Sequence, residues 1–143
     1  MKIILTITLM LTSLISFAGS ISVEDPYVRL LPKGSMATGA FMTISNSSEK
    51  TIKLLSATTS KSKITQIHNH IKENGMMKMR EIPYLEIPAK SSVKLKPGSF
   101  HIMLMQLRSD LVLGEKIKIN LSFDNDEKIT IDTPVKKINR KKM

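Results

Sequence analysis

Short runs in which apolar and polar residues alternate recur along the chain. Residues 37–45, 51–58, 91–97, 116–123 and 127–133 share this period of two, as in "KIKINLSF". The period is typical of strands with one buried face, because successive side chains on a strand point to opposite faces. Turn-forming segments such as "SNSSEK", "LKPGS" and "DNDE" separate the runs. No window of helical period with a capping residue competes, so the sequence predicts an all-β, two-sheet antiparallel β-sandwich.

The pattern indicates a single domain over residues 21–135. It opens with "SISVEDPYVRL", where Pro26 suggests an edge strand, since an edge tolerates the missing backbone donor of proline. It is followed by the basic segment "KKINRKKM", residues 136–143. This tail has too little apolar surface to offset the entropy of ordering, so we expect it to be disordered.

The first 20 residues have the pattern of a secretory signal peptide. Lys2 precedes an uncharged apolar run from Ile3 to Phe17, and small residues follow it, so cleavage after Ala18 or after Ser20 would fit. The alternative is a retained N-terminal anchor helix, but the run is shorter than the roughly 20 residues that a membrane span needs. No cysteine follows the run, which argues against a lipid anchor. The sequence therefore predicts export to the periplasm.

Composition narrows the chemistry open to the chain. It contains no cysteine, which excludes thiol redox, thiolate zinc sites and the His/Cys copper centres of electron-transfer proteins. The net charge of +10 comes from lysines spread along the strands, which indicates a solvated lysine face or a weak anionic docking surface. Only two tyrosines and four phenylalanines are available to stack on bases, so a nucleic-acid partner is not expected.

Histidine and methionine are concentrated in one part of the sequence. All three histidines and five of the ten methionines lie between residues 65 and 107: His68, His70, His101, Met76, Met77, Met79, Met103 and Met105. In "HIMLMQL", alternation places Ile102 and Leu104 on a predicted core face and His101 and Met103 on the other face.

The segment before it has the same pattern. His68 and His70 share a face, as do Met77 and Met79, whereas Met76 is expected on the opposite, core-facing side. "IKENGM" predicts a tight turn at Asn74–Gly75, which would make the two strands a hairpin. One strand of this hairpin would carry imidazoles and its neighbour thioethers.

Imidazole and thioether together suit a soft monovalent cation, of which Cu(I) is the biologically common one. Thioether neither titrates nor forms disulfides, and zinc and calcium would instead favour thiolate, carboxylate or other oxygen ligands. The competing interpretation is that the methionines fill a hydrophobic core and the chain is a metal-free interaction module. The joint placement of all the histidines with alternating methionines favours a metal site.

The spacing His68, ten residues, Met79, twenty-one residues, His101, one residue, Met103 resembles the motif of the PCuAC periplasmic copper chaperones. "ENGMMKMR", "LKPGSFHIMLM" and "GAFMTISN" are similar to that family as well. The resemblance implies a cupredoxin-like β-sandwich that holds one Cu(I) through His68, Met79, His101 and Met103. His70 stands where relatives often have methionine, and would be a spare or exchanging ligand.

The resemblance also implies a function. PCuAC proteins carry Cu(I) toward the dinuclear copper centre of cytochrome c oxidase, so the expected partner is an oxidase subunit or an assembly factor. The same ligands would serve a protein that sequesters copper for tolerance, which remains the alternative. No catalytic constellation is present, and the chain is not expected to be an enzyme. The tail offers only Met143 as a soft ligand, so a Cu(II) site there is not expected.

Overall fold

The computed structural model describes residues 19–138, which form ten strands and no helix. The strands are β1 Ile21–Arg29, β2 Ala37–Asn46, β3 Ile52–Thr58, β4 Ser62–Glu73, β5 Met76–Glu81, β6 Leu85–Ile87, β7 Ser91–Leu95, β8 His101–Leu107, β9 Lys116–Phe123 and β10 Lys128–Lys136. Accordingly, nothing in residues 19–138 is a helix long and apolar enough to cross a membrane. The predicted signal peptide falls almost wholly outside the described residues and stays a prediction.

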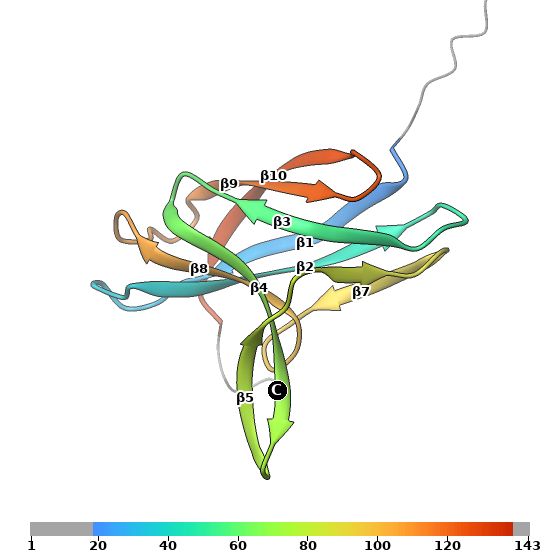
Figure 1. Cartoon of the computed structure of the whole chain (residues 1–143). Coiled ribbons are helices and arrows are strands. Elements are labelled where there is room, and N and C mark those ends of the chain that lie inside the picture. Colours follow the sequence, from blue (N-terminus) through green and yellow to red (C-terminus); the bar gives the residue numbers. More distant parts are fainter. Residues whose placement is uncertain (1–18, 139–143) are drawn as a thin grey trace, which may run out of the picture.

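The strands form two layers that pack face to face (Figure 1). Hydrogen bonding follows one path, β5-β4-β8-β2-β1-β10-β9-β3-β6, with β7 also paired to β2. All pairs are antiparallel except β1 with β10, which run parallel through Val28–Val135 and Arg29–Lys136. The predicted all-β sandwich is therefore confirmed, with one parallel contact where the end of β10 returns to the first layer.

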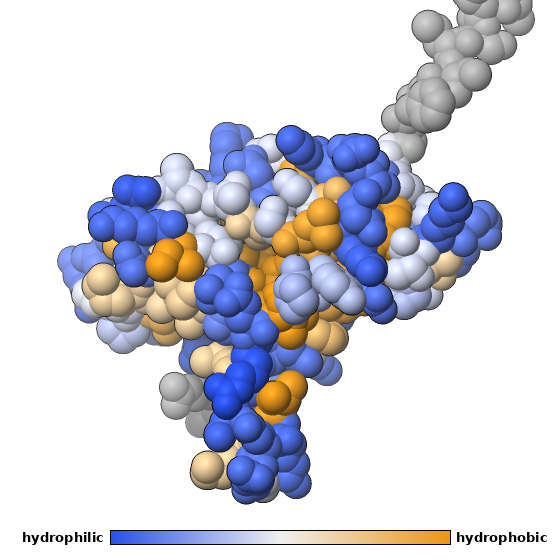
Figure 2. All heavy atoms as spheres, viewed as in Figure 1, coloured by the Kyte–Doolittle hydropathy of each residue, from blue (hydrophilic) through white to orange (hydrophobic). Residues whose placement is uncertain are grey.

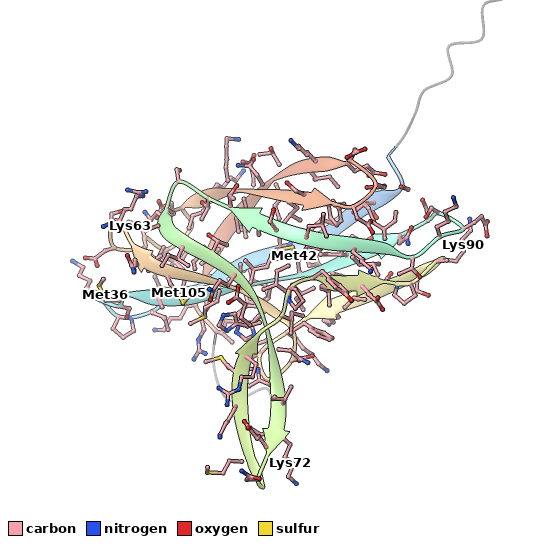
Figure 3. All side chains as sticks on the ribbon, in the orientation of Figure 1. Met36, Met42, Lys63, Lys72, Lys90 and Met105 are labelled. Atoms are coloured by element: carbon pink, nitrogen blue, oxygen red, sulfur yellow. The ribbon has the colours of Figure 1, made fainter. Side chains whose placement is uncertain are left out.

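The core lies between the layers. Ile44, Ile102 and Leu104 project inward from the β2/β8 layer and meet Leu54 and Leu121 of the opposite layer, and all five are fully buried. Figure 3 places Met42 in this interior, and Figure 2 shows hydrophobic side chains gathered in the middle of the molecule. The face of β8 predicted to be core is thus core, which leaves His101 and Met103 on the outer face of their layer.

The structure refines two expectations at the ends of the domain. β1 as a whole runs between β2 and β10, but β10 pairs with it only at Val28 and Arg29, so the backbone at Pro26 has β2 alone beside it and is locally an edge, as predicted. Pro26 also lies where the β1–β2 register shifts between Glu24 and Tyr27, a bulge in which proline removes no ladder hydrogen bond. At the other end, β10 includes Lys136, whose carbonyl accepts a hydrogen bond from Leu30. Residues 139–143 lie outside the described range, so the disorder of the tail stays a prediction.

The β4–β5 hairpin projects beyond the sandwich (Figure 1). Its turn has positive φ at both Asn74 and Gly75 (51° and 78°), the geometry predicted for this dipeptide. Because the opposite layer does not reach this far, both faces of the hairpin meet solvent. Met76 is therefore 61% exposed, which corrects the expectation that its side of the strand faces the core. Its assignment to the face opposite Met79 is right, since Met76 pairs with Glu73 and Met79 with His70.

Candidate metal site

Strand register brings the three histidines and two of the methionines to one place. On the outer face of the first layer, His68 of β4 stands directly opposite His101 of β8, and His70 of β4 directly opposite Met79 of β5. Met103 lies two residues after His101 on the same face. The ring centroids of His68 and His70 are 5.6 and 5.2 Å from that of His101. His101 is thus the centre of the cluster.

The β8 side of the site is closely packed. His101 is only 3% exposed, and its Nδ1 donates to the carbonyl oxygen of Ser99 at 3.0 Å. That bond fixes the ring and leaves Nε2 as the lone-pair nitrogen. The ring of Phe41 lies beside it, with centroids 6.1 Å apart, and crosses over Gly39, where a Cβ would come within 2.8 Å of Phe41 Cζ. Glycine is therefore required beneath this ring.

A cavity of about 300 Å³ opens above these residues. Its lining includes Met79, His101 and Met103, three of the four ligands expected from the resemblance, together with His70. The His70 ring lies 3.2 Å, through Nδ1, from the same Ser99 carbonyl oxygen, so Nε2 is the lone-pair nitrogen of the neutral tautomer that this bond selects. Both rings are therefore oriented by one backbone oxygen, and each keeps a free nitrogen.

His68, the fourth expected ligand, lies beside the cavity and does not line it. Its Nε2 donates to Gln66 Oε1 at 2.9 Å, which makes Nδ1 the lone-pair nitrogen. Nδ1 is buried and has no hydrogen-bond partner among the described residues. A buried, unpaired nitrogen costs free energy unless something binds it, so its lone pair is suited to a metal ion.

Burial keeps two of the imidazoles neutral, the form that binds metal. Desolvation lowers the pKa of His101 below its usual 6.5, the hydrogen bond that the ring donates to the Ser99 carbonyl oxygen raises it, and His70 and His68 lower it further. Desolvation likewise lowers the pKa of His68, partly offset by the carboxylate of Glu81 opposite it on β5. At neutral pH both rings are therefore ready to donate a lone pair.

The donor set limits which ions the site suits. In residues 19–138, no three side chains among histidine, cysteine, aspartate and glutamate converge into a metal site of their own. A site here must therefore include the sulfur of Met79 or Met103, and thioether sulfur favours soft ions such as Cu(I) over Zn(II). Met103 is half-buried whereas Met79 is 46% exposed, so one sulfur sits inside the site and the other at its rim.

Several residues that shape the site carry no signal in the sequence. Ser99 acts through its backbone, Gln66 is an ordinary strand residue, and Arg29 reaches the cavity from a segment far away in the chain. Phe41 and Gly39 share a face of β2, a relation that alternation gives, but their closeness to His101 depends on the β2–β8 pairing. Register between distant strands is the information that sequence reasoning lacked.

Comparison with known proteins identifies the family of the chain. The family described as "Putative lipoprotein LpqE-like" matches residues 21–135, nearly the whole described domain. The chain belongs to the LpqE-like family. "Putative lipoprotein Lxx21020" of Leifsonia xyli is 34% identical to this LpqE-like protein over 120 residues, covering 83% of this chain and 71% of the relative. "Uncharacterized protein RP573" of Rickettsia prowazekii is 31% identical over 114 residues, 74% of this chain and 63% of the relative.

Solved structures confirm the resemblance to PCuAC proteins. The Cu(I) form of DR1885 from Deinococcus radiodurans is 30% identical to the LpqE-like protein, with a TM-score of 0.67, and the match covers 80% of this chain and 76% of that one. The copper-bound PCuAC domain of PmoF2 has a TM-score of 0.72 at 22% identity, covering 84% and 95%, and supports the fold alone. The predicted cupredoxin-like β-sandwich is confirmed.

Proposed function

We propose that this LpqE-like protein binds one Cu(I) ion and passes it to another protein. The observation that carries the proposal is the convergence of two imidazoles and two thioethers on one open cavity, with both rings oriented by a single carbonyl and a third imidazole, His68, beside the cavity. The 30% identity to DR1885, a protein solved in its Cu(I) form, supports a copper chaperone role. The proposal makes the protein a carrier and not an enzyme, with copper as its cargo.

We assign the copper ligands to His68, Met79, His101 and Met103, with His70 as a fifth donor. Five donors exceed the two to four that Cu(I) uses, so one ligand can be replaced by another without releasing the ion. Exchange of this kind is what a carrier needs when an acceptor's ligands must displace its own. His70 lies between Met79 and His101 and is suited to that exchange.

The acceptor we propose is the dinuclear copper centre of cytochrome c oxidase, reached directly or through an assembly factor, with the periplasm as the compartment. The PCuAC relationship supports this acceptor, and relatives named as lipoproteins support a location outside the cytoplasm.

The binding test is an anaerobic Cu(I) titration of the mature domain against a chromogenic chelator. We expect one Cu(I) per chain, and the double variant His101→Ala/Met103→Leu to lose at least about 100-fold in affinity, because it removes the two donors of β8. Met76→Leu, on the opposite face of the hairpin, is the matched control and should bind as the wild type does. A preference for Zn(II), or equal losses in variant and control, would disprove the proposal.

Delivery is tested separately by mixing the copper-loaded protein with a soluble, copper-free domain that carries the dinuclear site of the oxidase. Transfer faster than the spontaneous release of copper to solution indicates a direct hand-off. Transfer limited by spontaneous release would instead favour sequestration, the same ligands then serving storage.

A further inference from the structure

A second cavity lies on the same outer face as the metal site. It is a cleft of about 520 Å³ between β1, β7 and the end of β10, and it includes the ring of Tyr27. Register fixes its side of the layer: Tyr27 stands opposite Phe41, and Phe41 lies two residues after Gly39, which stands opposite Met103. The rings of Tyr27 and Phe41 are 5.2 Å apart between centroids, and Phe41 in turn lies beside His101. The cleft and the metal site are therefore neighbours, divided by two aromatic rings.

Positive charge dominates the cleft. Four lysines line it, Lys94, Lys96, Lys136 and Lys137, and all four are exposed. Asp25 is the single carboxylate of the lining. Arg29, which stands opposite Lys136 in the β1–β10 pair and lines the metal cavity, extends the positive surface toward the copper ligands.

These cations differ from many others in the molecule in having no internal counterion. Within residues 19–138, the ion pairs involve Lys53, Lys61, Lys78, Arg80, Lys90 and Lys118, and none involves a lysine of the cleft or Arg29. A concave surface lined by one sign of charge concentrates its field and attracts partners of the opposite sign. An anionic group should therefore bind more tightly in the cleft than at an isolated surface lysine.

We propose that this cleft, which we call the lysine cleft, docks an acidic segment of the protein that receives copper. The inference rests on the proposed function, because a docking site beside the copper ligands orients the acceptor toward them. The volume exceeds what a single carboxylate or phosphate fills, which favours a peptide segment with several carboxylates. A flat anionic membrane would contact the lysine rim but could not enter the concave floor at Tyr27.

The rings of Tyr27 and Phe41 hold the lysine cleft at a fixed distance from the copper ligands. Because Phe41 is 5% exposed and sits over Gly39, it cannot move far without disturbing β2. An acidic segment seated against Tyr27 would therefore stand at a set distance from His101. Electrostatic complementarity of this kind sets the orientation and the association rate more than the final affinity.

The test uses the copper-free, isotope-labelled protein and a blocked hexaglutamate peptide, followed by NMR. We expect chemical-shift changes confined to the lysine cleft, and an affinity that falls at least about tenfold in Lys94→Gln/Lys136→Gln. Raising salt from about 20 to about 200 mM should weaken binding strongly, since exposed charges are screened at the higher concentration. Both substituted lysines are exposed, so the fold should be retained, which thermal unfolding checks.

The matched control is Lys63→Gln/Lys72→Gln, which changes the net charge by the same amount. Figure 3 places Lys63 at one end of the sandwich and Lys72 near the hairpin tip, and neither lines the cleft. Peptide affinity in this control should change by less than about twofold. Equal losses in the two variants, or shifts spread over the whole surface, would show a diffuse charge effect and overturn the proposal.

Two further measurements distinguish the proposal from a membrane-binding surface and from an effect on copper binding. Binding to phosphatidylglycerol vesicles that needs the cleft lysines, without binding of hexaglutamate, would assign the surface to a membrane and overturn an acidic protein partner. Cu(I) affinity in Lys94→Gln/Lys136→Gln should stay within about twofold of the wild type, because neither lysine is a ligand. If the wild type failed to bind Cu(I), the proposed function would fail while the peptide result would still stand on its own.

Discussion

The two sides of the candidate site differ in how firmly the fold holds them. On β8, His101 is nearly buried, its ring is tied to the Ser99 carbonyl, and Met103 stands opposite Gly39 in a strand flanked on both sides. On the hairpin, Met79 belongs to β5, which is the edge of its sheet, and is 46% exposed. One side is placed by the core of the sandwich and the other by a two-stranded projection.

This difference suggests a division of labour. Ligands on a packed strand lose little entropy when they bind an ion, whereas ligands on an exposed hairpin can move away and be replaced. We therefore expect the β8 side to set the affinity and the hairpin side to set the rate of release. The expectation is open to direct test, because β8 contributes one imidazole and one thioether, and the hairpin contributes two imidazoles and one thioether.

The largest effect should come from His101. We expect His101→Ala to lower Cu(I) affinity by more than about 100-fold, and Met79→Leu by only about tenfold, because the second removes a donor that His70 can replace. Stopped-flow transfer of Cu(I) to a chelator measures the release rate. In Met79→Leu this rate should rise by a larger factor than the factor by which the affinity falls. Equal affinity losses in the two variants would remove the distinction between the two sides.

Next in size is the relation between His68 and His70. If either imidazole can complete the site, His68→Ala and His70→Ala should each cost about tenfold or less, and the double variant should lose more than the product of the two. Chelator competition on the three variants measures this. Simple multiplication of the single effects would mean that the two rings act independently, and a silent His70→Ala would remove it from the ligand set.

The local features of the site, the faces of β8 and the turn of the hairpin, could be predicted from the sequence. Alternation in "HIMLMQL" correctly separated the buried Ile102 and Leu104 from the outward His101 and Met103, because strand periodicity is a local property. The Asn74–Gly75 turn was equally predictable, since its backbone geometry is encoded in two residues. The ligand assignment itself followed from a family resemblance and still awaits measurement.

The features that the sequence did not predict have a common cause in long-range structure. Met76 was assigned to the core because the sequence does not show where the opposite layer ends, and the bulge at Pro26 leaves no mark in the local sequence. The position of His70 over the cavity, and of His68 beside it, depends on how β4 pairs with β8 and β5. Pairing between strands separated by a loop is set by the whole fold, and a single sequence gives only the faces.

A smaller effect concerns the stability of the copper-free protein at acid pH. Burial lowers the pKa of His101 and His68 in the folded state, so between 6.5 and those lower values the unfolded chain binds more protons than the folded one. The free energy of unfolding should therefore fall as pH decreases through 6.5, and this contribution should level off below the folded pKa values. Glu81 on β5, His70 on β4 and Arg29 on β1 are the other charged or titratable groups facing these rings.

Thermal unfolding from pH 7.5 to 4.5 measures this dependence, with His68→Gln/His101→Gln as the control that keeps polar side chains but cannot titrate. The wild type should lose more stability than the control as pH falls below 6.5. Parallel curves would indicate that carboxylates alone govern the acid behaviour, and that the rings lie in a less desolvated environment than the structure shows.

The smallest and most local test follows individual methionines. Exposed thioethers oxidise readily to the sulfoxide, and Met76, Met77 and Met79 are 61%, 60% and 46% exposed, so dilute peroxide should modify all three in the metal-free protein.

Ag(I) is a soft, redox-inert substitute for Cu(I). When free Ag(I) is present at about 100 times its Kd, only about 1% of the protein molecules have an empty site. Oxidation of Met79 should therefore slow by up to about 100-fold. Met76, on the opposite face of β5, is the internal control and should oxidise at an unchanged rate, as peptide mass spectrometry would show. Protection of Met77 with Met79 would extend the metal site toward the hairpin tip, whereas protection of neither would confine it to β8 and refute the proposed role of the hairpin in release.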